Sequence, residues 1–110
     1  MITIDEFKRA EMRVGKITAA ERVNGSDKLL KLRVDLGVEI GERQILAGVG
    51  KQYQPENLLG RYVAVVANLE PRMLMGFESQ GMMLAASDGE TIAILSPDLE
   101  KDIKPGALVH

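Results

Sequence analysis

Residues 26–36 have the sequence Ser26-Asp27-Lys28-Leu29-Leu30-Lys31-Leu32-Arg33-Val34-Asp35-Leu36. From Leu30 onwards, apolar and charged residues alternate with a period of two. This period is typical of a β-strand that has one face in a core and the other in solvent. Lys31 and Arg33 are therefore predicted to point the same way from an exposed sheet face. A cationic strand face of this kind favours contact with the phosphates of a nucleic acid.

A second informative stretch begins at Asn68-Leu69-Glu70-Pro71-Arg72 and continues through Gly76, Ser79, Gln80, Gly81 and Met82. It places polar residues and glycines where a loop returns into a strand. Such a loop beside a cationic strand face is predicted to form a phosphate-binding surface.

Short strands account for most of the remaining pattern. They are predicted at residues 13–23, 29–36, 43–47, 61–69, 82–86 and 91–95. Val14 and Ile17 are three residues apart, so a regular strand would point them to opposite faces. A bulge at Gly15 would bring both side chains to the core. A helix of one or two turns is predicted at residues 55–60, and another at residues 3–10, where Thr3 and Glu6 match a capping box. Short strands with a brief helix between the third and the fourth favour an all-β fold, a small Greek-key barrel of the OB type. Another small barrel or a sandwich is the alternative.

Length and charge limit the number of domains and the kind of ligand that this protein can have. A chain of 110 residues fits one domain over residues 1–110, with a core that needs neither disulfides nor metal. The net charge of −2 argues against a strongly basic nucleic-acid binder. The first 55 residues, however, hold ten basic against eight acidic side chains. A small basic patch is therefore compatible with the total, and its binding should be weak and salt-sensitive.

The sequence offers no catalytic machinery. There is no cysteine, and the only histidine is His110. The segment Gly48-Val49-Gly50-Lys51 departs from a phosphate loop, because Ile45 and Gln52 stand where Gly and Ser or Thr are required. No catalytic residue, metal site or cofactor is predicted.

Nothing in the chain predicts a membrane partner. The longest apolar run, residues 63–67, is too short to span a bilayer, and acids stand where a secretory signal would carry bases. A cytoplasmic protein is expected.

Aromatic residues are few, whereas methionines cluster. Only two Phe and two Tyr are present, which argues against stacking the bases of an unstructured strand and favours a folded RNA as the nucleic-acid ligand. Four methionines gather late in the chain: Met73, Met75, Met82 and Met83. Core packing is the expected role for such residues, but Met73 and Met75 fall in a loop, where they would suit a partner surface.

Several of these stretches, taken together, resemble one known family. They are Arg13-Val14-Gly15-Lys16-Ile17, residues 26–32, Val34-Asp35-Leu36-Gly37, Tyr53-Gln54-Pro55-Glu56, residues 68–72, Glu78-Ser79-Gln80-Gly81-Met82 and Leu84-Ala85-Ala86. The combination covers residues 3–109 and resembles the tRNA-binding domain appended to methionyl-tRNA synthetases. The same domain occurs in free-standing structure-specific tRNA-binding proteins and in endothelial monocyte-activating polypeptide.

The resemblance implies a five-stranded OB-fold barrel with extra N- and C-terminal elements and a symmetric homodimer. It also implies that tRNA is bound at the outer corner of the L, largely without regard to the anticodon. Eight positions match binding residues of the family: Lys28, Lys31, Arg33, Asn68, Arg72, Ser79, Gly81 and Met82. Met73 stands where family members often carry a basic residue, and Met75 where the residue can be basic, and both changes would lower the affinity.

Three functions remain open on these grounds. The first is a noncatalytic tRNA-binding module that supports methionyl-tRNA synthetase. It would do so either as an appended domain or as a separate subunit that associates with the catalytic chain. The second is a peptide-binding export chaperone of the same family, which the methionine-rich loop would suit. The third is a module whose only role is dimerisation.

Overall fold

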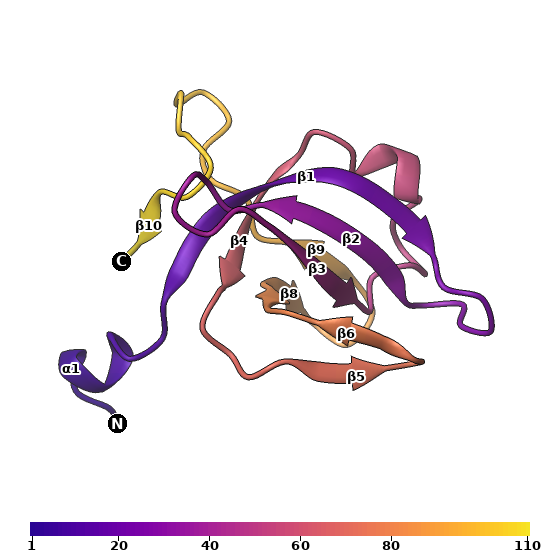
Figure 1. The fold of residues 1–110 in the computed structure, drawn as a ribbon, viewed down its shortest axis with the longest axis horizontal. Coiled ribbons are helices and arrows are strands. Elements are labelled where there is room, and N and C mark those ends of the chain that lie inside the picture. Colours follow the sequence, from indigo (N-terminus) through magenta and orange to yellow (C-terminus); the bar gives the residue numbers. More distant parts are fainter.

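The computed structural model describes all residues, 1–110. Its main feature is an antiparallel sheet in the order β3-β2-β1-β4-β7, nearly closed into a five-stranded barrel (Figure 1). These strands are β1 (Met12–Arg22), β2 (Leu30–Asp35), β3 (Glu42–Ala47), β4 (Tyr62–Val66) and β7 (Met82–Met83). The predicted all-β, OB-like barrel is confirmed.

Strand β1 is long and curved because it pairs with β2 along one edge and with β4 along the other. Its pairing with β2 shifts register between Ile17 and Ala19, so the irregularity lies at Thr18. The bulge predicted at Gly15 is therefore wrong, since the β1–β4 register runs unbroken past that residue. Gly15 instead lets two strands approach closely, because a Cβ there would lie 2.4 Å from Val34 Cγ1.

Val14 reaches a buried position without a bulge. Its backbone hydrogen-bonds to Gly106 and Ala107 of the C-terminal segment, which lies alongside β1. Val14 is buried, but it stands apart from the main core cluster to which Ile17 belongs. Val14 and Ile17 are therefore both buried, although they point to opposite faces of β1, because each face is covered by a different part of the protein.

The core fills the barrel with aliphatic side chains from β2, β3 and β4. Leu30, Leu32 and Val34 of β2 are fully buried, and the residues between them are more exposed. Each such side chain contributes about 1.5–3 kcal/mol when it leaves water. This burial fixes which face of β2 is left to solvent.

The two edge strands of the sheet, β3 and β7, do not pair directly along their length. Residues 79–80, which precede β7, form hydrogen bonds to β3 and so join the two strands. We call this set of hydrogen bonds the seam. Gln44 and Gln80 bond each other twice, because Gln80 Oε1 accepts from Gln44 N–H (3.0 Å) and Gln80 N–H donates to the Gln44 carbonyl (2.8 Å). Ser79 Oγ accepts from Leu46 N–H (3.0 Å).

Two small hairpins extend from the barrel. The first joins β5 (Arg72–Leu74) to β6 (Phe77–Ser79), where only loop was predicted, and it turns at Met75 and Gly76, which both have positive φ. The second joins β8 (Ala85–Ser87) to β9 (Ile92–Ile94). The strand predicted at residues 82–86 is thus broken at Leu84 into β7 and β8.

Short elements complete the chain. The helix at residues 55–60 is a single 3₁₀ turn, η1 (Pro55–Asn57). The N-terminal helix, α1, is shorter than predicted and spans Ile4–Phe7, with both bonds of the Thr3–Glu6 capping box present (3.0 and 3.1 Å). Strand β10 (Leu108–Val109) pairs with the start of β1, so both termini lie at the same end of the barrel (Figure 1). No helix has the length and apolar character that crossing a membrane requires.

Candidate functional site

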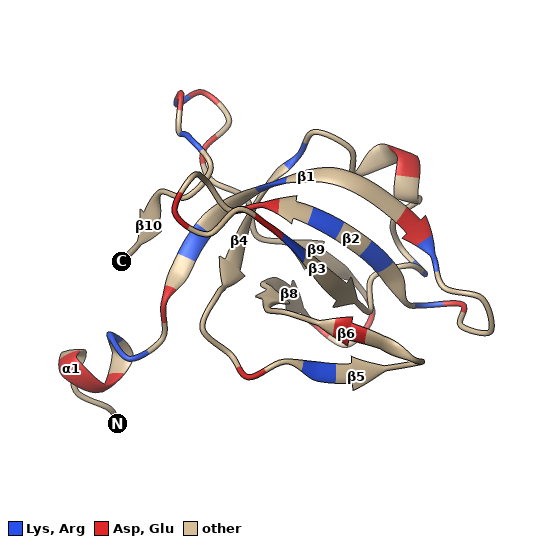
Figure 2. Ribbon diagram, viewed as in Figure 1, with Lys and Arg blue, Asp and Glu red and all other residues tan.

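The outward face of β2 carries two cations, as predicted. Figure 2 shows Lys31 and Arg33 as two basic bands on this strand. Their side chains are 25% and 49% exposed. Because β2 alternates strictly between core and surface, both side chains stand on the same side of the sheet.

Each of these cations has an acidic partner that the sequence pattern did not reveal. Lys31 Nζ lies 2.7 Å from Glu21, which is directly opposite on β1, and Arg33 Nε lies 3.6 Å from Glu42, which is diagonally opposite on β3. Cross-strand neighbours of opposite charge attract each other, so phosphates would have to compete with two carboxylates at this face.

Lys31 also connects the barrel face to the β5–β6 hairpin. Its Nζ lies 4.3 Å from the centre of the Phe77 ring, within the range of a cation–π contact. Phe77 therefore serves as an anchor for the hairpin. The contact brings the second informative stretch alongside the first.

A hollow of about 340 Å³ opens between the β1–β2 turn, the end of β3 and the β5–β6 hairpin. Five of the eight predicted binding residues line it: Lys28, Arg72, Ser79, Gly81 and Met82. Lys28 and Arg72 form no ion pair, although Glu70 lies in the same wall. The hollow thus holds the two predicted cations that remain free.

Ser79 lines this hollow but its hydroxyl is committed to the seam. The residue is 3% exposed, and its hydroxyl accepts from Leu46 N–H and donates to the Gly81 carbonyl (3.1 Å). The hydroxyl therefore both accepts and donates a hydrogen bond within the protein. The position of Ser79 shapes the wall of the hollow by holding β6 against β3.

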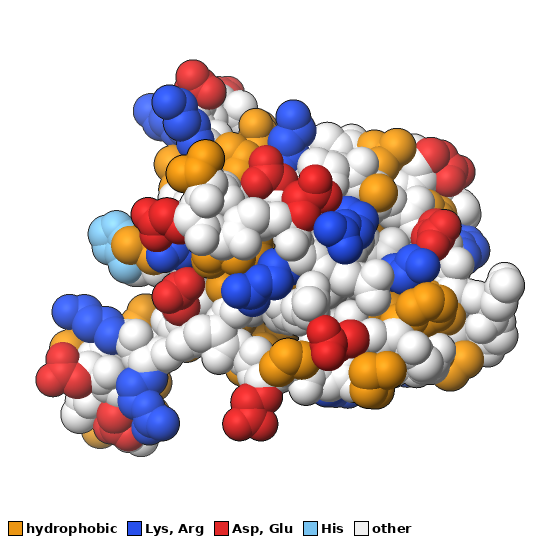
Figure 3. Space-filling view, viewed as in Figure 1, with side chains coloured by type: hydrophobic (Ala, Val, Ile, Leu, Met, Phe, Trp, Pro, Cys, Tyr) orange, Lys and Arg blue, Asp and Glu red, His pale blue; other side chains and the backbone are white.

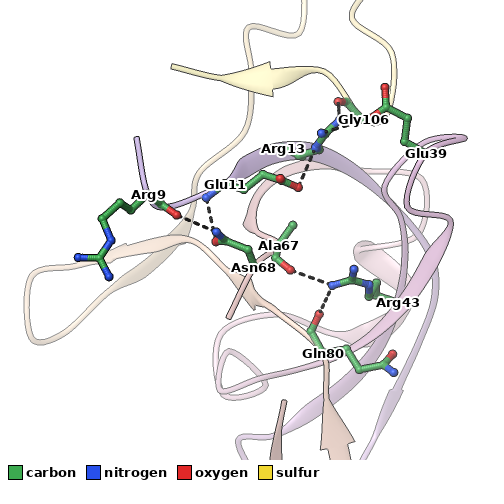
Figure 4. A network of polar contacts seen from close by, with 9 residues as sticks. All are labelled: Arg9, Glu11, Arg13, Glu39, Arg43, Ala67, Asn68, Gln80 and Gly106. Carbon is green, nitrogen blue, oxygen red and sulfur yellow. Dashed lines mark hydrogen bonds and ion pairs between the residues drawn. The ribbon is translucent and has the colours of Figure 1, made fainter. Parts of the chain in front are cut away.

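Asn68 does not line this hollow, and Figure 4 shows its side chain bonded to Arg9 and Glu11. Its Oδ1 accepts from Glu11 N–H (2.8 Å) and its Nδ2 donates to the Arg9 carbonyl (2.7 Å). The side chain ties the segment after α1 to the end of β4. It lines a second hollow of about 450 Å³ between residues 7–13 and 108–110.

Arg43 is a structural cation that sequence reasoning did not single out. Its Nη1 donates to the carbonyls of Ala67 (2.8 Å) and Gln80 (3.2 Å), as Figure 4 shows, and it has no acidic partner. These bonds join β3 to both ends of the connection between β4 and β7. No sequence signal marked this role, because both of its partners are backbone groups remote in sequence.

The methionines are more exposed than core packing would require. Met73, Met75 and Met82 are about half or more exposed, whereas Met83 is buried. Core packing is thus wrong for three of the four. Figure 3 shows apolar side chains along the lower edge of the molecule, over the β5–β6 hairpin. Methionine is a flexible, polarisable side chain that suits an adaptable contact surface.

The structure shows no cluster of three or more His, Cys, Asp or Glu side chains that could share a metal ion. One carboxyl has a perturbed pKa: hydrogen bonds from the backbone N–H groups of Thr91 and then Glu90 lower the pKa of Asp88 below its ordinary value of 3.8. Asp88 lies in the β8–β9 turn and is fully exposed, so this shift reflects turn formation.

Comparison with known families gives one match that covers most of the chain. The model described as "Putative tRNA binding domain" matches residues 12–107. Among curated proteins, the methionine–tRNA ligase of Thermotoga maritima is 52% identical over 108 residues, which cover 98% of this chain and 16% of the ligase. That of Thermococcus kodakarensis is 50% identical over 109 residues, 99% of this chain and 14% of the ligase. The chain thus spans about a sixth or less of the length of these relatives.

Solved structures give the same fold over the full chain. A MetRS-related protein from Pyrococcus horikoshii has a TM-score of 0.88 and 34% identity, and covers 100% of this chain and 98% of its own. The chaperone CsaA from Bacillus anthracis has a TM-score of 0.89 and 27% identity, with coverage of 100% and 99%.

Proposed function

The chain belongs to the tRNA-binding domain family, and from this premise we propose that it is a noncatalytic module that binds tRNA for methionyl-tRNA synthetase. It would act as an appended domain or as a separate subunit that raises the local concentration of tRNA. The match to the ligases is confined to this domain and includes no catalytic region. The proposed place of action is the cytoplasm, where tRNA is aminoacylated.

One observation carries the proposal. The cationic face of β2 and the hollow with its two free cations lie side by side, because the Lys31–Phe77 contact holds the β5–β6 hairpin against β2. In OB barrels, the face of the second and third strands, together with the loops beside it, is the usual ligand face. The surface is only modestly cationic, so binding should be weak and should depend on salt.

The ligand that we propose is folded tRNA, bound at the outer corner of its L and largely independent of the anticodon. No aromatic residue lines the hollow, and the ring of Phe77 on the adjoining hairpin is covered by Lys31. A strand without structure would need several such rings for its bases, whereas folded RNA can be recognised by shape and backbone. Intact tRNA should therefore bind more tightly than an unstructured oligonucleotide of equal length.

The test is a titration of tRNA at several salt concentrations. Lys28→Ala and Arg72→Ala should each weaken binding and reduce the slope of log affinity against log salt by about one unit. Lys101→Ala is the matched control, because Lys101 is also exposed and unpaired but lies in the C-terminal loop, on the opposite side of the molecule in Figure 1. Equal effects of all three substitutions, or equal affinity for tRNA and for the unstructured oligonucleotide, would contradict the proposal.

A peptide-binding chaperone is the second candidate. It is favoured by the exposed Met73, Met75 and Met82 and by the similarity to the CsaA chaperone fold. Apolar methionine contacts lose little strength with salt, whereas phosphate contacts lose much. Peptide binding that persists at high salt and is lost in Met73→Ser, with no binding of tRNA, would favour this candidate.

We also propose a two-fold homodimer formed by the terminal elements. Ile4 and Leu108 are more than half exposed at this end of the barrel, and Phe7 and Leu108 line the second hollow. Exposed apolar surface and a short edge strand such as β10 are features that a partner copy would cover. Light scattering should give twice the chain mass of 12.0 kDa, and Leu108→Glu should reduce it to the monomer. A parent of about 12 kDa would contradict the dimer, and a dimer that binds neither tRNA nor peptide would favour a dimerisation-only module.

A further inference from the structure

The hollow beside β2 combines cationic and apolar surface in one place. Lys28 and Arg72 supply two positive charges and Glu70 one negative charge, so its walls carry a net positive charge. Leu69 and Met82 supply apolar surface that is about half exposed. A ligand that matches both features has an anionic group next to a flat apolar body.

Two glycines in the walls offer unused hydrogen-bonding groups. Neither the N–H of Gly48 nor that of Gly81 donates to any group in the protein. A Cβ at Gly48 would meet no atom within 4 Å, so the space in front of this residue is open. Both N–H groups are therefore available to acceptor atoms of a ligand that reaches these residues.

The size of the hollow limits the ligand. About 340 Å³ lies at the small end of the roughly 300–1,000 Å³ that is usual for small-molecule sites. This room suits one nucleotide and excludes a stacked run of several. An extended apolar peptide fits the charge less well, because it supplies no anion for Lys28 and Arg72.

From these features, the geometry points to the hollow as a site for one unstacked nucleotide of the bound RNA, with its base against Leu69 and Met82 and its phosphate at Lys28 and Arg72. This inference rests on the proposed tRNA-binding function. It explains how a chain with few aromatic rings can still hold a base, since apolar walls replace the ring. Extruding a base is least costly where the base is unpaired, so unpaired nucleotides of a folded RNA are the preferred source.

The blocking variant is Gly48→Leu, which adds a large side chain to the wall of the hollow, where a Cβ meets no atom within 4 Å, without a change of charge. Ala93→Leu on β9 is the matched control, because Ala93 is exposed and lines neither this hollow nor the second one. Met82→Ala removes an apolar wall and serves as a second variant if Gly48→Leu unfolds. Thermal unfolding checks each fold.

Affinities are measured for a tRNA transcript and for a fully paired RNA duplex with the same number of phosphates. A base stacked on an aromatic ring contributes about 5- to 150-fold, and with aliphatic walls in place of the ring the parent should prefer the tRNA by at least the lower value, about 5-fold. Gly48→Leu and Met82→Ala should remove most of this preference and leave the salt slope unchanged, whereas Ala93→Leu should keep it. A parent that binds tRNA with no such preference, or a folded Gly48→Leu that retains it, overturns the inference while the tRNA function stands.

A second arm uses AMP, UMP, inorganic phosphate and a neutral apolar decapeptide as probes, read by the amide NMR signals of Gly48 and Gly81. Both nucleotides should shift these signals in the parent but not in Gly48→Leu, and phosphate and the peptide should not. If phosphate shifts the signals as much as the nucleotides do, the hollow is only an anion site. If only the peptide shifts them, the hollow is a peptide site. Either result overturns the inference. If tRNA does not bind the parent but AMP does, the tRNA function fails and a free nucleotide is the ligand.

Discussion

Replacement of Ser79 by alanine tests whether this residue closes the barrel or contacts the ligand. The residue is 3% exposed, and its hydroxyl bonds both Leu46 N–H and the Gly81 carbonyl, at 3.0 and 3.1 Å. The substitution leaves the Leu46 donor without a partner in a buried place. The lost partner should cost about 1–3 kcal/mol of unfolding free energy.

For a domain of this size, each 1 kcal/mol corresponds to roughly 4 °C in Tm, so Ser79→Ala should lower Tm by about 4–12 °C. Calorimetry or circular dichroism measures the shift. Ser96→Ala is the control, because Ser96 is exposed and makes no side-chain hydrogen bond, and it should stay within about 0.5 kcal/mol of the parent.

Binding of tRNA distinguishes the two roles. Well below its Tm, Ser79→Ala should bind tRNA with little loss of affinity and with the parent salt slope, since no charge is removed. An unchanged Tm together with a clear loss of affinity would refute the reasoning, because the hydroxyl would then serve the RNA and not the seam.

Three further outcomes are expected. Glu21→Gln should free Lys31 from its ion pair, so tRNA binding should tighten and its salt slope should steepen by up to about one unit; an unchanged slope would show that Lys31 does not meet phosphate. Gly15→Ala should cost about 1–3 kcal/mol in denaturant unfolding, because the new Cβ would overlap Val34 Cγ1 in the core, and a neutral result would mean that the strands can move apart. The pKa of Asp88 in the folded protein is below its ordinary 3.8, so the charged carboxylate stabilises the fold above that pH, and this contribution is lost as the pH falls through the folded pKa. Asp88→Asn should therefore lose more unfolding free energy relative to the parent at pH 7 than at pH 2. An equal loss at both pH values would contradict this expectation.

The predicted strand pattern was most accurate where side-chain alternation was strict. The burial of β2 follows the sequence alternation residue by residue, because successive side chains in a strand must point to opposite faces. The capping box at Thr3 was also predicted correctly, since it depends on four consecutive residues only. Local geometry is sufficient for features of this kind.

The predictions failed where two segments remote in sequence decide the outcome. The β5–β6 hairpin was predicted as loop from its polar residues and glycines, yet its strands pair over three residues on each side. The burial of Val14 was attributed to a bulge, whereas the C-terminal segment lies against its strand. Neither partner could be identified from the residues alone.

The sequence by itself determined the barrel class, the family and the common face of Lys31 and Arg33, because these follow from periodicity and from the order of short motifs. Only the tertiary structure decided that both cations meet acids, that Lys28 and Arg72 stay free around one hollow, and that Asn68 lies at the other end. The physical reason is that an ion pair or a hollow depends on strand register and on how loops fold back, and both are set by the packing of the whole core. Periodicity tells which face a side chain takes, but not which neighbour it meets there.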